Sequence, residues 1–278
     1  MNFLTPAEIA AAAANAGKAK CELPFAKMFV LGLLAGVYIG FGANLATKMG
    51  AATDVGSSGQ IFLFGAVFTV GLIMVVICGV ELFTGNNMAC FISACNGQAS
   101  WGGLLYNWVV VFIANLLGSI ALVYIIYYGN YWGDANALTA MGASAVSIAK
   151  GKMSLTWGAA FCRGICCNWL VCLAVWMAFA SKDLIGKIFG IFFPIMAFVS
   201  SGFEHSVANM FFIPMGITVA NSAPAAVAEN FAMAPEAVTS FFTYGTFFMN
   251  NLIPVTLGNI VGGALFTGGI YWFCYLRK

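Results

Sequence analysis

The sequence predicts an all-α membrane protein with six transmembrane helices. Of its 278 residues, 62% are hydrophobic and 7% are charged, whereas soluble domains carry about 25% charged residues. A helix needs about 20 residues to cross the hydrocarbon core of a bilayer. Six charge-poor runs reach that length: residues 28–47, 61–80, 104–128, 155–180, 184–220 and 247–276. The chain is therefore expected to form a single membrane domain, residues 1–278, with no soluble module.

Residues 1–25 are expected to contain a short cytoplasmic helix ahead of the first span. Thr5 is a capping hydroxyl, Pro6 suits the first helical position, and Glu8 stands three residues after the cap, a combination typical of helix starts. Seven lysine and arginine residues, including Arg277 and Lys278, flank the spans on the side of the termini, against three on the other side. The positive-inside rule therefore predicts that both termini are cytoplasmic.

The body of this first helix is mostly alanine. Such a segment forms a helix readily but offers little apolar area for tight docking. We therefore expect it to dock and undock, and to help gate the cytoplasmic end of the protein near Leu82 and Phe83.

Small residues recur in the first span. Gly32, Gly36 and Gly40 stand at every fourth position, and this spacing lets a second helix approach closely in lipid. The pattern suits contacts between protomers and contacts inside one protomer equally well.

The fifth run is interrupted at Gly202, Glu204 and His205, the last of which is the only histidine of the chain. Ionisable groups near the middle of a membrane-length segment are expensive and mark functional sites. Gly202 lets the backbone leave the helix, and irregular backbone at membrane depth is tolerated where it faces protein or water. The stretch predicts a broken helix that lines a pore. His205 is a candidate proton-exchanging group, because an imidazole titrates near neutral pH.

The two halves of the chain share a pattern of polar residues. A glycine, a glutamate two positions later and an asparagine seven positions later occur at Gly79, Glu81 and Asn86, and again at Gly202, Glu204 and Asn209. Asn115 and Asn259 follow in the third and sixth spans, and Asn44 and Asn168 precede the glutamates by 37 and 36 residues. Three spans in each half give the halves opposite orientations in the membrane, as in many channels and transporters.

This pattern predicts two inverted three-helix repeats, residues 26–128 and 155–276, with the second and fifth helices broken. The plainer interpretation of Glu81, Glu204, Asn86 and Asn209 is structural support. Their side chains would satisfy backbone groups at the broken helix ends.

Nine cysteines raise the alternative of a membrane thiol oxidoreductase. All but Cys21 lie in or beside apolar runs, where free cysteine packs as a small hydrophobe. Cys166 and Cys167 are adjacent and lie inside the fourth span. With a single histidine, the chain also has few partners for a metal. We expect neither a metal nor another cofactor, and no enzymatic activity.

Three motifs resemble the formate/nitrite transporter family, which consists of pentameric channels with an aquaporin-like fold. Residues 81–85 (Glu-Leu-Phe-Thr-Gly) resemble the loop in the broken second helix of the family, and residues 168–174 (Asn-Trp-Leu-Val-Cys-Leu-Ala) its fourth helix. The stretch around His205 resembles its broken fifth helix. The resemblance covers essentially the whole chain.

The resemblance implies a site. Thr84 and His205 should face each other in the pore of each protomer, with Asn168 in their hydrogen-bond network. Apolar constrictions should lie on both sides, formed by Leu82 and Phe83 toward the cytoplasm and by Phe68, Leu72 and Phe198 toward the outside. A lysine in the loop before the fourth helix should attract anions, and the spacing indicates Lys152, with Lys150 as the alternative.

The expected function is a multi-pass channel of the cell membrane, in the inner or plasma membrane, for small monovalent anions of weak acids. Formate is the first choice, nitrite and hydrosulfide are alternatives, and His205 would exchange a proton with the anion. A neutral-solute pore of the aquaporin type is less favoured, because the chain has no Asn-Pro-Ala signature. The expected partners are the anion, protons, membrane lipids and further copies in a homopentamer, and no nucleic acid.

Overall fold

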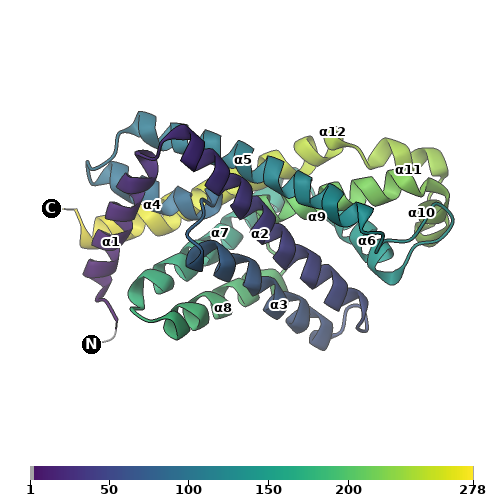
Figure 1. Ribbon diagram of the computed structural model, residues 1–278, viewed down its shortest axis with the longest axis horizontal. Coiled ribbons are helices and arrows are strands. Elements are labelled where there is room, and N and C mark those ends of the chain that lie inside the picture. Colours follow the sequence, from purple (N-terminus) through teal and green to yellow (C-terminus); the bar gives the residue numbers. More distant parts are fainter. Residues whose placement is uncertain (1–2, 278) are drawn as a thin grey trace.

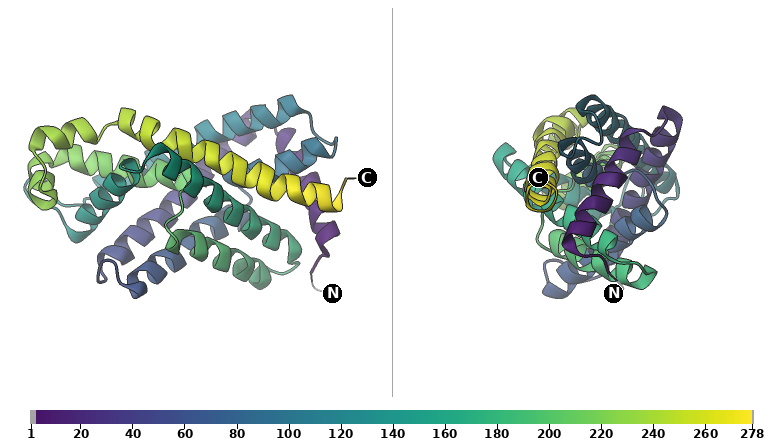
Figure 2. Two further views of the ribbon diagram at one scale, coloured as in Figure 1. Left: turned by 180° about the vertical axis from the view of Figure 1, so that it is seen from behind. Right: turned by 90° about the vertical axis from the view of Figure 1, so that its left-hand side faces the viewer.

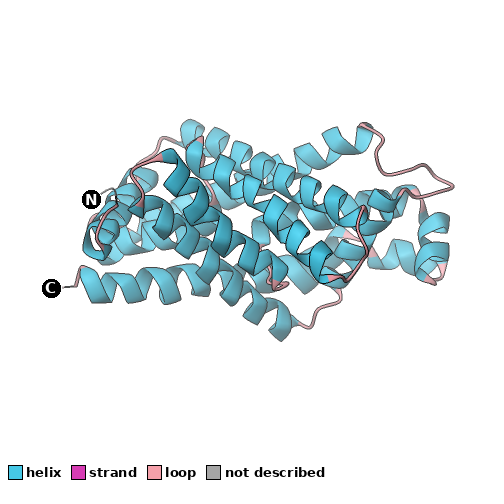
Figure 3. Ribbon diagram, turned by 90° about the horizontal axis from the view of Figure 1, so that it is seen from below, coloured by secondary structure: helices cyan, strands magenta, loops and turns pink. Residues whose placement is uncertain are grey.

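The protein is a bundle of helices. A computed structural model describes residues 3–277, and in this part of the chain no strand is formed (Figure 3). Lys278, counted above among the basic residues, lies outside the described residues. The first half contains α1 (Pro6–Cys21), α2 (Phe25–Ala51), α3 (Ser58–Ile77), α4 (Phe83–Cys95) and α5 (Trp101–Tyr128).

The second half begins with α6 (Ala140–Met153), α7 (Trp157–Ala180), α8 (Leu184–Ser200) and α9 (Ser206–Ser222). The short helices α10 (Pro224–Phe231) and α11 (Pro235–Phe241) follow. The last span then runs without interruption through α12 (Tyr244–Thr246), η1 (Phe247–Leu252), α13 (Ile253–Ile260), η2 (Val261–Gly269) and α14 (Ile270–Tyr275), where η1 and η2 are π-helical.

The predicted spans correspond to helices of the structure. By length and hydropathy, α2, α3, α5, α7 and the last span could each cross a membrane. The fifth span is divided into α8 and α9, of 17 residues each. Residues 78–82 interrupt the path from α3 to α4, and residues 201–205 interrupt that from α8 to α9. Gly79 and Gly202 have φ values of 71° and 69°, a conformation that glycine adopts without steric cost.

The two halves pack in the same way. Helix α2 crosses α5 at glycines, since a Cβ on Gly36 would lie 2.1 Å from the Asn115 carbonyl oxygen. In the second half, a Cβ on Gly258 would lie 2.2 Å from the carbonyl oxygen of Phe161 in α7. Backbones this close require glycine at the crossing. The structure therefore uses the small residues of the first span for packing inside the protomer.

The two repeats point in opposite directions. Figure 1 shows α1 and α4 near the end that holds both termini, and α6 and α9 toward the opposite end, with α3 and α8 side by side. Figure 2 shows the last span running back along the molecule to the C-terminal end. The fold is the predicted pair of inverted three-helix repeats with broken second and fifth helices.

Helix α1 confirms the predicted start and corrects one expectation. The Thr5 backbone N–H donates to Glu8 Oε2 at 2.7 Å, and the hydrogen bonds from Thr5 hold the pKa of the exposed Glu8 carboxyl below its ordinary value. The helix packs tightly on α4, because Gly17 brings its backbone so close that a Cβ would lie 1.9 Å from the Ala89 carbonyl oxygen. The expected loose docking is wrong for this structure, since small residues allow close backbone contact.

A helix that the sequence did not predict precedes the second repeat. Lys152 was expected in a loop, but it lies in the last turn of α6. Helix α6 packs on α9 at Gly216, where a Cβ would lie 2.8 Å from the Ala145 carbonyl oxygen. It therefore corresponds to α1, which packs on α4 through its own Gly17.

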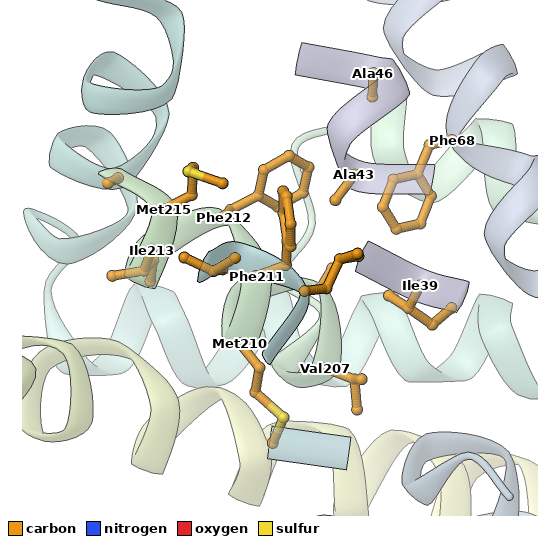
Figure 4. Packing of buried hydrophobic residues seen from close by; sticks show 14 of the residues in the cluster. Ile39, Ala43, Ala46, Phe68, Val207, Met210, Phe211, Phe212, Ile213 and Met215 are labelled. Atoms are coloured by element: carbon orange, nitrogen blue, oxygen red, sulfur yellow. The ribbon is translucent and has the colours of Figure 1, made fainter. Parts of the chain in front are cut away.

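Apolar side chains fill the space between the repeats. Figure 4 shows Phe68 of α3 near Ile39 and Ala43 of α2, with Phe211 and Phe212 of α9 facing them. The rings of Phe68 and Phe212 are stacked, with centroids 6.2 Å apart. This packing holds the N-terminal ends of α4 and α9 at the centre of the protein.

Candidate functional site

The two broken spans meet at a threonine and a histidine. Thr84 is in the first turn of α4, His205 is the N-cap residue of α9, and Thr84 Oγ1 lies 2.8 Å from His205 Nε2. The Ala208 backbone N–H donates to His205 Nδ1 at 3.2 Å. Since Nδ1 accepts a hydrogen bond, the proton of the neutral ring is on Nε2, and Nε2–H donates to Thr84. Both groups are buried.

Asn168 ties this centre to the helices around it. Its amide Nδ2 lies 3.1 Å from the Thr84 carbonyl oxygen, 3.2 Å from Asn87 Oδ1 and 2.7 Å from the Asn259 carbonyl oxygen. The side chain thus connects α7, α4 and the last span. It fixes the backbone of Thr84, and so the position of the hydroxyl that faces His205.

Asn115 holds the first break in place. The Phe83 N–H donates to Asn115 Oδ1 at 2.9 Å, and Asn115 Nδ2 donates to the carbonyl oxygens of Glu81 and Gly32 at 2.9 and 2.8 Å. These contacts satisfy backbone groups that no intrahelical bond can reach. The amide therefore replaces the missing helical hydrogen bonds of the break.

Asn259 does the same at the second break. The Ser206 N–H donates to Asn259 Oδ1 at 2.9 Å, and Asn259 Nδ2 donates to the carbonyl oxygens of Glu204 and Gly164 at 2.9 and 2.8 Å. The bonds match those of Asn115 one for one. Gly32 and Gly164 are therefore equivalent, and four residues later Gly36 is equivalent to Asn168. The proposed match of Asn44 with Asn168 is wrong.

A network of charged and amide groups surrounds each glutamate. In the first half, Lys20 Nζ contacts Glu81 Oε1 at 2.7 Å, and Asn86 Nδ2 donates to Glu81 Oε2 at 2.7 Å. Asn107 accepts from Asn86 at 2.9 Å and donates to the Lys20 carbonyl oxygen at 3.0 Å. The buried carboxylate is thus fully paired, which is the condition for its burial.

The second half repeats this network at the other end of the protein. Lys152 Nζ contacts Glu204 Oε1 at 2.9 Å, and Asn209 Nδ2 donates to Glu204 Oε2 at 2.6 Å. Asn251 accepts from Asn209 at 2.7 Å and donates to the Lys152 carbonyl oxygen at 3.1 Å. In the described part of the chain, the side chains of Glu81, Glu204, Asn86 and Asn209 bond to lysine and amide side chains. The expectation that they satisfy backbone groups at the broken ends is therefore wrong, because Asn115 and Asn259 do so instead.

Two cavities approach the centre from opposite ends. The first, called the Lys152 cavity, has a volume of about 350 Å³ and is lined by Lys152, Glu204 and His205 among others. The second, called the Lys20 cavity, has a volume of about 200 Å³ and is lined by Lys20 and Leu82 among others. His205 therefore lines one cavity and Leu82 lines the other.

Four of the five expected constriction residues are divided between the cavities. Phe68 and Phe198 line the Lys152 cavity, with ring centroids 5.9 Å apart. Leu72 lines the Lys20 cavity together with Leu82, on the other side of the centre from Phe68. Phe83 lines neither cavity, and its ring packs 5.1 Å from that of Phe112 in α5.

The structure distinguishes the two candidate lysines. Lys152 lines the cavity and lies 5.6 Å from the centroid of the Phe212 ring. Lys150 does not line it, and its ammonium lies 5.5 Å from the centroid of the Phe231 ring. Of the two lysines, Lys152 thus lines the cavity, and Glu204 balances its charge.

Three members of these networks were not identified from the sequence: Lys20, Asn107 and Asn251. A signal was present, because Asn107 and Asn115 in the third span have the same eight-residue spacing as Asn251 and Asn259 in the sixth. Eight residues bring two side chains back to one face of a helix. The repeated spacing thus marks one face in each of these spans.

Comparison with known proteins agrees with this geometry. The profile described as "Formate/nitrite transporter" matches residues 7–273. This chain belongs to that family. Family members are channels and transporters, and the expectation that the chain is not an enzyme is therefore confirmed.

Several relatives match this chain over nearly its whole length. A protein named "Probable formate transporter" from Methanothermobacter thermautotrophicus is 46% identical over 100% of this chain and 99% of its own. The formate channel FocA of Escherichia coli (strain K12) is 37% identical over 100% of this chain and 96% of its own. A solved structure described as a pentameric formate channel with formate bound has a TM-score of 0.78 and 39% identity, over 91% of this chain and 98% of that one.

Proposed function

We propose that this family member is a channel that carries formate across the cell membrane. The observation on which the proposal rests is the Thr84–His205 pair, which lies between two cavities that open toward opposite ends of the protein. The printed names of the relatives support formate as the anion. Nitrite and hydrosulfide are alternatives, because each is also the small anion of a weak acid.

The anion must be neutralised near the centre. Phe68 and Phe198 on one side and Leu72 and Leu82 on the other provide apolar walls, and an unpaired charge in such surroundings costs several kcal/mol. Near the middle, the N-terminal ends of α4 and α9 present partial positive charge. Thr84 and His205 Nε2–H are the side-chain groups at that point that could hydrogen-bond an anion.

His205 would supply the proton in exchange for one from water. With Nδ1 accepting from Ala208, the resting ring is neutral. A second proton on Nδ1 breaks this hydrogen bond, at a cost of about 1 kcal/mol, and an anion beside the ring offsets that cost. Transfer of the Nε2 proton of this charged ring to formate produces formic acid, which can pass the apolar walls, and leaves the neutral ring protonated on Nδ1. Release of the Nδ1 proton to solution and uptake of one at Nε2 restore the resting tautomer, so that one proton in all has passed from solution to formate.

The proposal extends to the oligomeric state of the protein and to its orientation in the membrane. We infer a homopentamer in the inner or plasma membrane, supported by the pentameric relative and by apolar outer surfaces such as Val109 and Ile125, which are exposed in the single protomer. Both termini lie at one end of the molecule (Figure 1), and the excess of basic residues there supports a cytoplasmic location. Native mass measurement should give a fivefold species, and a monomer that transports would rule the pentamer out.

The decisive test is formate flux into liposomes as a function of external pH. His205→Phe should abolish most flux, because it removes the proton-exchanging group while keeping an aromatic ring. His205→Asn should pass formate with a weaker pH dependence. Thr84→Val should lose less formate flux than His205→Phe, since it deletes one hydrogen bond, worth about 0.5–1.5 kcal/mol. Equal curves for wild type and both His205 variants would refute proton exchange, and a wild type that carries no formate would refute the function itself.

A further inference from the structure

One cation of the Lys152 cavity is not part of the networks described above. Arg163 lies in the second turn of α7, lines the cavity together with Lys152 and Glu204, and is exposed. On insertion scales an arginine costs about 2.5–3.5 kcal/mol at the centre of a span and less near its ends, and ionisable residues that face a cavity generally serve ion or substrate pathways. The position therefore calls for an explanation beyond packing.

The carboxylate of this cavity is fully used by other groups. Glu204 Oε1 contacts Lys152 at 2.9 Å, and Oε2 accepts from Asn209 at 2.6 Å and from Asn251 at 3.1 Å. Within residues 3–277, no ion pair or side-chain hydrogen bond is formed by the Arg163 guanidinium. Lys152 and Glu204 cancel, and Arg163 thus provides the net positive charge of the cavity.

The repeat shows that the fold does not need a cation at this position. The Glu204 N–H donates to the Arg163 carbonyl oxygen at 3.3 Å, and the Glu81 N–H donates to the Leu31 carbonyl oxygen at the same distance. Arg163 and Leu31 are therefore equivalent, each one residue before the glycine that receives the amide of Asn259 or Asn115. Leu31 serves the same backbone contact with an apolar side chain, so the charge of Arg163 is not needed for the break.

We propose that the Arg163 guanidinium is the first binding group of the Lys152 cavity for anions that carry two oxygen atoms on one centre, the class that includes formate and nitrite. A guanidinium presents parallel N–H donors that match such a pair of oxygens, whereas an ammonium is a point charge. From Arg163 the anion passes Lys152 and reaches His205, both of which line the same cavity. The inference rests on the proposed function and assigns a specificity residue to it.

The test compares formate and hydrosulfide flux for Arg163→Leu and Arg163→Lys in liposomes at low and high salt. Arg163→Leu gives α7 the leucine that stands at the equivalent position of the first repeat, Leu31. It should raise the half-saturating formate concentration about tenfold to a hundredfold at low salt, the effect of losing one charge-assisted hydrogen bond, with the maximal flux little changed. Added salt should shrink the difference. Arg163→Lys should restore hydrosulfide flux more fully than formate flux, because only formate can use two parallel donors.

Lys150→Gln is the matched control. It removes one positive charge from the neighbouring helix α6, at a residue that does not line the cavity. It should leave the half-saturating concentration within twofold of wild type. An unchanged half-saturating concentration in Arg163→Leu would show that Arg163 only anchors α7 at the membrane surface, and an equal rise in Lys150→Gln would reduce its role to a long-range field. In both cases wild-type formate flux would persist, so the proposed function would stand while this inference failed.

Discussion

The two amides that hold the breaks give a quantitative test of the fold. Asn259→Leu deletes three buried hydrogen bonds of 2.8–2.9 Å, and Asn115→Leu deletes three with the same lengths. A net loss of about 1 kcal/mol for each bond gives about 3 kcal/mol, and the backbone groups left without partners raise this to about 3–5 kcal/mol. Because the contacts are equivalent, the two variants should lose the same stability.

The assay is thermal unfolding of the purified protein in one detergent at a fixed heating rate. In a protein of this size, 1 kcal/mol shifts Tm by about 2–4 °C, so each variant should lose roughly 10 °C. Asn44→Leu is the control, because Asn44 Oδ1 is buried without a hydrogen-bond partner among the described residues. It should shift Tm by no more than about 3 °C.

The reasoning would be refuted by losses below 3 °C in both variants, or by a loss in one that is more than twice the loss in the other. The first result would mean that the breaks are held by packing alone. The second would mean that the equivalence of the two sets of contacts has no energetic counterpart. Formate flux should still differ between Asn259→Leu and Asn115→Leu. Asn259 holds the break that carries His205, whereas Asn115 holds the break that carries Leu82.

Two further variants test the supports of the site. Glu204→Gln leaves the largely buried Lys152 ammonium without a counter-charge and should destabilise the protein by about 3 kcal/mol; a thermal melt equal to wild type would contradict this. Gly17→Ala adds a Cβ 1.9 Å from the Ala89 carbonyl oxygen and should loosen α1, measured as faster trypsin cleavage near its C-terminal end. The control Gly158→Ala, whose Cβ would meet no atom within 4 Å, should leave cleavage unchanged.

The spans and breaks could be predicted from the sequence because each depends on local composition. Apolar length marks a span wherever it occurs, and a glycine two residues before a glutamate in such a run marks a break, as at Gly79 and Gly202. Both glycines have the positive φ that the chain needs to change direction there. These signals do not depend on which helices become neighbours in the folded protein.

Helix α6 and the role of Lys20 could not be predicted in this way. The sequence of α6 is short and only mildly apolar, and its stability comes from close packing on α9 at Gly216. Lys20 acts on a carboxylate 61 residues away, and nothing near it in the chain indicates that partner. The true equivalent of Asn168 is a glycine, Gly36, so matching asparagines by sequence spacing alone gave the wrong pair.

The repeat explains the scaffold, whereas the differences between its halves indicate the chemistry. Amides, glutamates and lysines occur in matched sets and support both breaks equally. Besides Asn168, whose equivalent is Gly36, the halves diverge at two polar residues: His205 is equivalent to Leu82 as the N-cap of its half-helix, and Arg163 is equivalent to Leu31. Both polar residues line the same cavity. In the two proposals above, one end of this scaffold therefore binds the anion and offers it a proton, and a neutral acid crosses the apolar side chains Leu72 and Leu82 on the other side.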